Sequence, residues 1–485
     1  MLNSRSQPIA IASERDRWSS RIETVAREDL VLFINACLAC TGQQEFYSEA
    51  FGQGVSIDFL HDYILGNYRL LYTRSLAAGI NHFNTAEMIL KLLATGKAVS
   101  PEHRAEEGAL IAASLNRLPP QRAWKVLEQL KVRGINNRRS RAIARDYLRH
   151  CKHIEFQAVK YRSKVRAIAS HAHLTLPGEL GNFLFRNWQQ RSYETPLFEQ
   201  FRQAHYSAEA IYSLPFTIAE GLATKHRIPR PLFLERIQAQ MTEGERLRLQ
   251  QTAARLPKVE IAVDWENLPL TRLALYILSL PPEKREVRFE VALIQAAQKL
   301  LAAAPFKLGK VAAVLDCSYS TSGSSEKRRR PLGVALASHY LLQAAASEYR
   351  AFWTIPQTNP LTVRPRGQTD LATPLLDALD WGAELIVILS DGCENDPPQG
   401  AAEVLRVYRH KLDPERHTSI VQCNPVFDGE DFSLRSLHPS IPTVGLRDAE
   451  DLPAMLNFAR FAEGSASLRE LEDYLAGRVR QLLKA

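Results

Sequence analysis

The residues best suited to chemistry are short oxygen-bearing side chains in the C-terminal third of the chain. Asp316, Ser318 and Ser320 alternate directly after one apolar run, Asp391 follows another, and Thr369 lies in a polar loop between them. In a non-helical loop, residues two apart turn to the same side. Mg²⁺ prefers a mixed set of carboxylate, hydroxyl and water oxygens. The sequence therefore predicts that these five residues hold one divalent cation, Mg²⁺ or Mn²⁺.

The five residues can share a cation only if three distant loops meet. After residue 305, short apolar runs alternate with segments of helical spacing, which indicates a doubly wound parallel sheet covered on both faces. Ligands of such sheets lie at the carboxyl ends of the strands, where all three loops fall. The alternatives are strand-end loops whose acids only cap helices, or a site that is plugged or empty. The expected strands are 310–315, 349–355, 385–389 and 418–422, and the expected helices are 332–346, 371–379 and 401–410.

This arrangement resembles the metal-ion-dependent adhesion site of von Willebrand factor A domains over roughly residues 305–480. The resemblance implies that Ser318, Ser320 and Thr369 coordinate the ion directly, and that Asp316 and Asp391 do so directly or through water. It also implies an open coordination position for a carboxylate from a partner. Neutral hydroxyl ligands leave the ion positively charged, which suits that role.

No catalytic set stands out beside these loops, so we expect a protein that is not an enzyme. His339 and His410 fall on expected helices, without a paired nucleophile at readable spacing. Cys317 and Cys393 flank the metal loops, and we expect them to be small core side chains rather than nucleophiles. The chain contains no Gly-x-x-x-x-Gly-Lys-Ser/Thr phosphate loop.

Positive charge is concentrated in residues 121–170, which hold 14 Lys plus Arg against 3 Asp plus Glu, whereas the whole chain of 485 residues has a net charge of +8. Such a stretch favours a nucleic acid partner, because phosphates relieve the repulsion between the cations and release counterions. We prefer RNA over duplex DNA, since no DNA-reading motif is visible. The alternative is a solvated helix face neutralised by acids elsewhere. The candidate RNA contacts are Lys131, Arg133, Arg138, Arg139, Arg141, Arg145, Arg149, Lys152, Lys160, Arg162, Lys164 and Arg166.

Histidines lie within and just after the basic stretch. His150 and His153 are three apart, and His171 and His173 are two apart. Metal binding is one interpretation of these pairs. Phosphate contact or plain surface histidines are favoured, because no cysteine or acid is in register with them.

The first 304 residues show helical spacing almost throughout, for example over 86–93, 106–115, 123–130, 142–148 and 289–301, with 259–263 as the one strand-like run. A succession of short helices suggests a HEAT-like repeat, open as a solenoid or closed as a ring. We therefore divide the chain into a helical domain, 1–304, and a sheet domain, 305–485.

Cys37 and Cys40 lie in an apolar segment, and we expect them to be small core residues rather than a redox or zinc pair.

A basic helical domain followed by such an A domain resembles the Ro autoantigen family, whose N-terminal part is the TROVE module. The local likeness lies in Gly367-Gln-Thr-Asp-Leu-Ala-Thr-Pro374, similar to a Gly-Thr-Asp-x-x-x-Pro segment of that family, and in the approach from Leu301 to Asp316. The resemblance implies a toroidal ring, closed by the A domain, whose basic residues bind structured or misfolded non-coding RNA.

Two functions follow as hypotheses. The first is a non-catalytic RNA-binding protein of Ro type, present as a monomer. The second is a protein-interaction scaffold, for example beside a MoxR-type ATPase, whose metal site binds an acidic residue of a partner.

The chain is 45% hydrophobic and 24% charged. The segment from Met1 to Glu14 has no apolar run of signal-peptide type, so we expect a soluble cytoplasmic protein without a membrane partner.

Overall fold

The computed structural model describes residues 14–46, 50–176, 178–186, 188–190, 192–257, 259–430, 432–464 and 466–484. Apart from Glu14, the segment in which we expect no signal peptide lies outside these residues. No described helix is long and apolar enough to cross a membrane.

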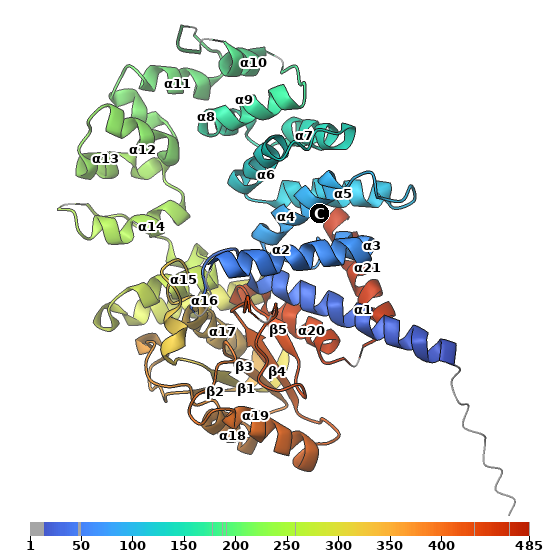
Figure 1. Cartoon of the computed structure of the whole chain (residues 1–485). Coiled ribbons are helices and arrows are strands. Elements are labelled where there is room, and N and C mark those ends of the chain that lie inside the picture. Colours follow the sequence, from blue (N-terminus) through green and yellow to red (C-terminus); the bar gives the residue numbers. More distant parts are fainter. Residues whose placement is uncertain are drawn as a thin grey trace, which may run out of the picture.

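A long succession of helices precedes the sheet (Figure 1). The helices are α1 (Glu14–Ala39), α2 (Ala50–Asn67), α3 (Arg69–Ser75), α4 (His82–Ala94), α5 (Arg104–Arg117), α6 (Pro120–Val132), α7 (Arg138–His150), α8 (Ile154–Lys160), α9 (Arg162–His171), α10 (Gly178–Phe185), α11 (Pro196–Ala204), α12 (Phe216–Lys225), α13 (Arg230–Ile237), α14 (Glu243–Ala253), α15 (Leu270–Ser279) and α16 (Val287–Ala303). The predicted helical character of this part is confirmed.

Strands and helices alternate in the remaining part. These elements are β1 (Leu308–Leu315), α17 (Arg330–Ala345), β2 (Ala346–Trp353), α18 (Ala372–Asp380), β3 (Leu385–Leu389), α19 (Gly400–Val407), β4 (Ser419–Asn424), β5 (Thr443–Gly445), α20 (Leu452–Ala462) and α21 (Leu468–Lys484). The four expected strands are all present, although β2 begins earlier than its predicted start.

Local sequence explains why helices form and how they stack. In α7, the Asn137 side chain accepts a hydrogen bond from the Ser140 N–H, and the Ser140 hydroxyl oxygen accepts one from the Asn137 N–H. This pair of hydrogen bonds caps the first turn of the helix. Ile143, Ala144 and Tyr147 then form a buried stripe at helical spacing. Because each helix buries one stripe, α4 packs on α6, α5 on α7, and both α6 and α7 on α9.

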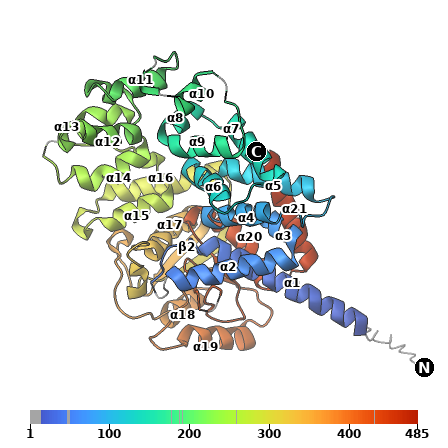
Figure 2. The ribbon, with the colours of Figure 1, turned by 45° about the horizontal axis from the view of Figure 1, so that its top comes forward.

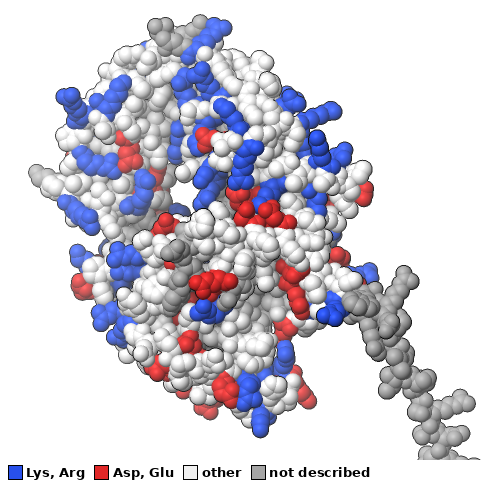
Figure 3. Space-filling view, viewed as in Figure 1, with Lys and Arg blue, Asp and Glu red and all other residues white. Residues whose placement is uncertain are grey.

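The helices form an arc whose two ends both pack on the sheet part. At one end α1 contacts β5, α20 and α21, and α21 reaches across to α3 and α5. At the other end α15 and α16 pack on α17. Figures 1 and 2 show the arc between these ends, and Figure 3 shows an opening through the molecule that the arc encloses.

The described strands make a parallel sheet in the order β2-β1-β3-β4-β5. Helices α18 and α19 cover one face, with Leu375 and Leu405 in a core cluster of their own. Helices α17 and α20 cover the other face and share their core with α1 and the arc. The predicted doubly wound parallel sheet is therefore observed. The order of the strands reverses between β1 and β3, and a switch point of this kind opens a crevice at the carboxyl ends of the two strands.

One hydrophobic cluster runs from α1 through the arc to one face of the sheet and on to α21. The proposed division at residue 304/305 stays a prediction, and this shared core links its two sides. Cys37 and Cys40 lie inside the cluster, with 0% and 1% of their surface exposed. They are free cysteines and small core residues, as expected.

The expected strand 259–263 is wrong, because the segment pairs with no strand among the described residues. Side chains satisfy its backbone instead. Gln250 Nε2 donates to the Ile261 carbonyl at 2.7 Å, and Arg246 Nη1 donates to the Ala262 carbonyl at 3.1 Å. Val259 and Ile261 are buried. The alternation of apolar residues therefore reflects the burial of every second side chain and not pairing in a sheet.

A buried polar network joins α1, α2 and α4. His61 lies between the Tyr72 hydroxyl, 2.9 Å from its Nδ1, and Asn84 Oδ1, 3.0 Å from its Nε2. The Asn84 amide donates to the Cys37 and Cys40 carbonyls at the end of α1. These partners suit a neutral imidazole that donates from Nε2 and accepts at Nδ1. Burial lowers the pKa of His61 to about 4.

Replacement of His61 should therefore make stability less sensitive to acid. The unfolded chain takes up this proton near pH 6.5 and the folded chain only near pH 4. The stability present at neutral pH is thus lost between these values, by about 1.4 kcal/mol per pH unit. We expect urea unfolding of His61→Gln to show a shallower pH slope in this window. His417→Gln is the control, because that side chain is 79% exposed. Equal slopes for His61→Gln and the parent chain would contradict this account.

Candidate metal centre and nucleic-acid interface

Three loops that follow β1, β2 and β3 meet at the crevice between β1 and β3. The Asp316 N–H donates to the Leu389 carbonyl at 3.0 Å, which ties the first loop to the end of β3. The Tyr319 N–H donates to the Gly367 carbonyl at 3.1 Å, which ties it to the second loop. The Thr369 N–H donates to Asn395 Oδ1 at 2.7 Å, which ties the second loop to the third. The predicted meeting of the loops is therefore observed.

Four of the five predicted side chains are joined by polar contacts. Asp316 Oδ1 accepts from the Ser318 N–H at 2.8 Å, and the Ser318 and Ser320 hydroxyl oxygens lie 3.2 Å apart. Ser320 in turn hydrogen-bonds to Asp391. The fifth residue, Thr369, is 3% exposed, and its hydroxyl has no protein partner among the described residues.

The two carboxylates form a buried like-charge pair. Asp316 and Asp391 are 1% and 4% exposed. Burial, and then the charge of Asp391, raises the pKa of Asp316 to about 7, although hydrogen bonds from Ser318 and Ser390 oppose the shift. Burial also raises the pKa of Asp391, while Ser320 and the more distant Arg435 lower it. Neither carboxylate has a Lys or Arg hydrogen-bond partner among the described residues. Two anions in this setting fit a bound cation.

The donor set also fits the kind of ion. Within the described residues, no group of three or more His, Cys, Asp or Glu could hold a metal. This excludes such a site at the histidines near the basic stretch. The candidate centre offers two carboxylates and three hydroxyls, which are oxygen donors suited to Mg²⁺ or Mn²⁺ rather than zinc.

Two residues complete the centre without having been assigned a role from the sequence. The Ser390 hydroxyl donates to Asp316 Oδ2 at 3.1 Å, and Asn395 holds the Thr369 backbone from the third loop. Ser390 was visible as the neighbour of Asp391 in a Ser-Asp-Gly sequence. Asn395 carried no signal, because its contact depends on how two distant loops pack.

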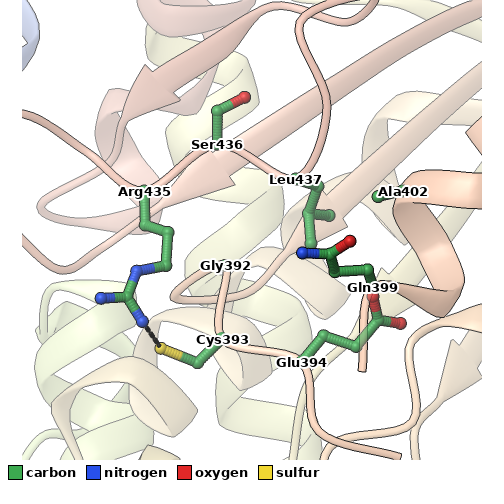
Figure 4. A pocket seen from close by; sticks show the side chains of 8 residues that line it. All are labelled: Gly392, Cys393, Glu394, Gln399, Ala402, Arg435, Ser436 and Leu437. Carbon is green, nitrogen blue, oxygen red and sulfur yellow. Dashed lines mark hydrogen bonds between the residues drawn. The ribbon is translucent and has the colours of Figure 1, made fainter. Parts of the chain in front are cut away.

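A hollow of about 470 Å³ adjoins the centre, lined by Gly392, Cys393 and Arg435 among others (Figure 4). Arg435 Nη1 donates to Cys393 Sγ at 2.7 Å, and its Nη2 donates to Asp428 at 2.8 Å. Cys393 is half-buried and faces this hollow, so the expectation of a core side chain was wrong for it. The loop turns outward after Asp391, which places the thiol beside the guanidinium. Cys317 is 0% exposed, as expected.

Four of the twelve candidate RNA contacts have structural partners. Arg133 pairs with Glu87 at 3.0 Å, and Lys164 pairs with Glu128 at 2.6 Å. Arg162 donates to the Phe183 carbonyl at 3.1 Å. Arg139 donates to Glu107 at 2.5 Å. Part of the positive charge therefore holds helices together.

Arg139 shows this structural role most clearly. Its partner Glu107 is 2% exposed and also accepts from Arg69 at 2.9 Å and Thr73 at 3.3 Å. Glu107 thus links α3, α5 and α7. A charge reversal at Arg139 would leave this buried carboxylate beside a second anion, so it tests folding rather than RNA binding.

The other eight candidates have no ion-pair partner among the described residues. Arg138, Arg145 and Arg149 are exposed and Arg141 is half-buried, all on α7. Lys160 lies over the Phe156 and Tyr161 rings, at 5.4 and 5.5 Å. The remaining members are exposed: Lys131, Lys152 and Arg166. Figure 3 shows Lys and Arg gathered over the arc and around its opening. The structure thus places an unneutralised basic surface on the predicted segment.

No protein-family model matches the chain, and no curated protein matches it. Among solved structures, the chain is similar to the Ro (RSR) protein of Deinococcus radiodurans. The two share 14% sequence identity at a TM-score of 0.42, and the similarity covers 90% of this chain and 100% of that chain.

Proposed function

We propose that the chain is a non-catalytic RNA-binding protein of Ro type, in which a HEAT-like helical ring carries the RNA and a von Willebrand A-type domain carries a divalent cation. The observation that supports RNA binding best is the row of arginines on α7 that form no ion pair with the described acidic residues. Arg138, Arg141, Arg145 and Arg149 repeat at steps of three and four, so they repel one another along one helix face. A phosphate backbone along that face removes the repulsion and releases counterions.

The predicted basic segment has a second feature that suits RNA. Lys160 and Arg166 lie over aromatic rings, which keeps their charged groups close to flat apolar surfaces. Flat surfaces beside cations favour unpaired bases, which stack while their phosphates meet the charge. We therefore propose structured non-coding RNA with accessible unpaired nucleotides as the ligand class.

For the metal, we propose that Asp316, Ser318, Ser320, Thr369 and Asp391 hold Mg²⁺ or Mn²⁺. The proposal rests on the buried pair of carboxylates, which accepts no hydrogen bond from a described Lys or Arg, and on the hydroxyls beside it. The ion would relieve the repulsion between the carboxylates. It would also offer a cationic position to an anionic group of a ligand. The chain's own residues orient the donors, since Ser390 and the Ser318 N–H hold both oxygens of Asp316.

The second candidate is a protein-interaction scaffold, for example for a MoxR-type ATPase. We call the edge of the sheet that carries the five proposed metal ligands the metal edge. This candidate is favoured because the metal edge lies beside the hollow that Arg435 lines, and both would attract a carboxylate of a partner. The two candidates use different surfaces, α7 and the sheet edge, so a single chain can serve both.

Reversal of the α7 charges should weaken RNA binding. We expect Arg138, Arg141, Arg145 and Arg149 replaced by Glu to reduce affinity for a fluorescein-labelled stem-loop RNA by at least about tenfold in fluorescence anisotropy. The dependence of log affinity on log salt should become shallower by about 2 to 3, since each lost phosphate contact removes about 0.7.

The control reverses four exposed cations elsewhere: Lys307, Arg364, Lys411 and Arg469. It changes the net charge equally and should leave most of the affinity. Equal losses in both variants would show only a general effect of net charge and would refute the assignment to α7.

Replacement of Asp316 by Asn should abolish metal binding without unfolding the protein. Mg²⁺ or Mn²⁺ at a hundredfold excess over the dissociation constant should stabilise the parent chain by about 2.7 kcal/mol. In Asp316→Asn this gain should vanish. The metal-free variant at pH 8 should be more stable than its parent by about 1 kcal/mol, because the like-charge repulsion is gone while an oxygen remains for the Ser318 N–H.

Calorimetric titration with Mn²⁺ and chemical unfolding measure these two effects. Asp370→Asn is the matched control, since that carboxylate lies in the same region and accepts from the Thr373 N–H at 2.9 Å to cap α18. A parent chain that does not bind Mn²⁺, or an Asp316→Asn variant that binds it equally well, would refute the metal proposal.

A further inference from the structure

Exposed apolar side chains gather along one face of α2. Phe51, Val55, Phe59 and Tyr63 follow at steps of four residues and are 82%, 54%, 57% and 38% exposed. The opposite face of the same helix is buried, as Ile57 and Ile64 show. Helix α2 thus has apolar residues on both faces, and only one of the two faces packs against the rest of the protein. An exposed apolar stripe of this kind marks an interaction surface. We call these four residues the α2 stripe.

Ring contacts join the α2 stripe to the metal edge. Near the start of the stripe, the Phe46 ring lies 6.1 Å from the Tyr319 ring, and Tyr319 stands between the predicted ligands Ser318 and Ser320. Tyr319 is itself 64% exposed. Further along, the Phe59 ring lies 5.7 Å from the Phe432 ring. The loop between β4 and β5, which carries Phe432 and Arg435, therefore contacts both the stripe and Cys393 beside the candidate centre.

The loop between β4 and β5 fills the space between these two regions. The Ser56 hydroxyl of α2 donates to the Gly429 carbonyl of this loop at 2.5 Å. Arg435 of the same loop lines the 470 Å³ hollow beside the metal edge, together with Ser436. Ser436 also lines a second hollow of about 400 Å³, whose apolar wall includes Leu32 and Leu434. The loop between β4 and β5 thus contacts α2 at Ser56 and lines both hollows.

Charge on this surface differs from that on the arc. Helix α2 contains Asp58 and Asp62 and no Lys or Arg. Asp29 of α1 lies at the far end of the stripe, where it accepts from the Tyr63 hydroxyl at 2.9 Å. The stripe therefore disfavours RNA and anionic lipid, both of which need cations.

We propose that the metal edge and the α2 stripe form one docking surface for an amphipathic helical segment of a partner protein. An acidic residue at one end of that segment meets the cation and Arg435. Its apolar side chains lie along Phe51, Val55 and Phe59, and basic residues at its other end face Asp29. The charge order follows from Arg435 and the proposed cation at one end of the surface and from Asp29 at the Tyr63 end. The acidic contact rests on the proposed metal site, whereas the apolar contact does not.

A displayed library of amphipathic helical peptides tests the proposal on the whole chain. The library holds a fixed apolar stripe at steps of four and varies the charge at both ends. It is selected in Mn²⁺ and eluted with EDTA. We expect the eluted peptides to carry Asp or Glu at one end and Lys or Arg at the other. A synthetic copy of a selected peptide should lose at least about tenfold in affinity on Phe51→Ser or Phe59→Ser.

Val132→Ser is the matched control, because that residue is 70% exposed on α6 and should not affect the peptide. Mn²⁺ titration of the Phe variants should be unchanged, so a failure of the metal site is recognised separately from a failure of the stripe. Peptides without acidic residues, or a peptide affinity that survives both Phe51→Ser and Phe59→Ser, would overturn the proposal.

Two further measurements address other occupants of the α2 stripe. We expect the affinity for the stem-loop RNA to be the same in Phe51→Ser and in the parent chain, and a loss would assign the stripe to RNA instead. We expect sedimentation of the parent chain to show no self-association that Phe59→Ser abolishes. Such self-association would assign the stripe to a second copy and refute a foreign partner.

Discussion

Parallel pairing of β1 with β3 places Leu315 beside Leu389, and the two residues that follow these strand ends are drawn into one crevice. The Asp316 N–H extends the pairing by one more bond to Leu389. Asp391, one residue further along its own loop, then lies close enough to raise the pKa of Asp316. Hydrophobic strands that must be buried on both faces thus bring two carboxylates together at a cost that only a cation or a proton relieves.

The crevice is also built against both ends of the helical arc. Near the start of the chain, the Gln44 N–H donates to Glu326 at 3.0 Å, and the Ser324 hydroxyl donates to the Gln44 carbonyl at 2.6 Å. From the end of the arc, Arg285 donates to the Leu361 carbonyl at 2.8 Å in the loop that leads to Thr369. The loops of the candidate centre are therefore held by residues from both ends of the arc.

Charge is divided between three tasks in this molecule. Some cations, such as Arg139 with Glu107, join neighbouring helices of the arc. Others on α7 form no ion pair within the part of the chain that the structure describes, and they give the arc its basic surface. The anions Asp316 and Asp391 are buried together at the sheet edge. Because the three sets lie on different elements, the surface that suits a polyanion is separate from the surface that suits a carboxylate and apolar side chains.

The sequence alone determined the helical and parallel-sheet parts, and it predicted that the loops after β1, β2 and β3 meet, because apolar periodicity and strand-end spacing are local patterns. Tertiary structure decided what local patterns do not encode. It paired Arg139 with Glu107, gave Asn395 its contact with Thr369, and turned Cys393 outward. It also left the segment 259–263 without a partner strand. In each case the outcome depends on which distant group arrives to satisfy a charge or a backbone carbonyl, and a single segment does not contain that information.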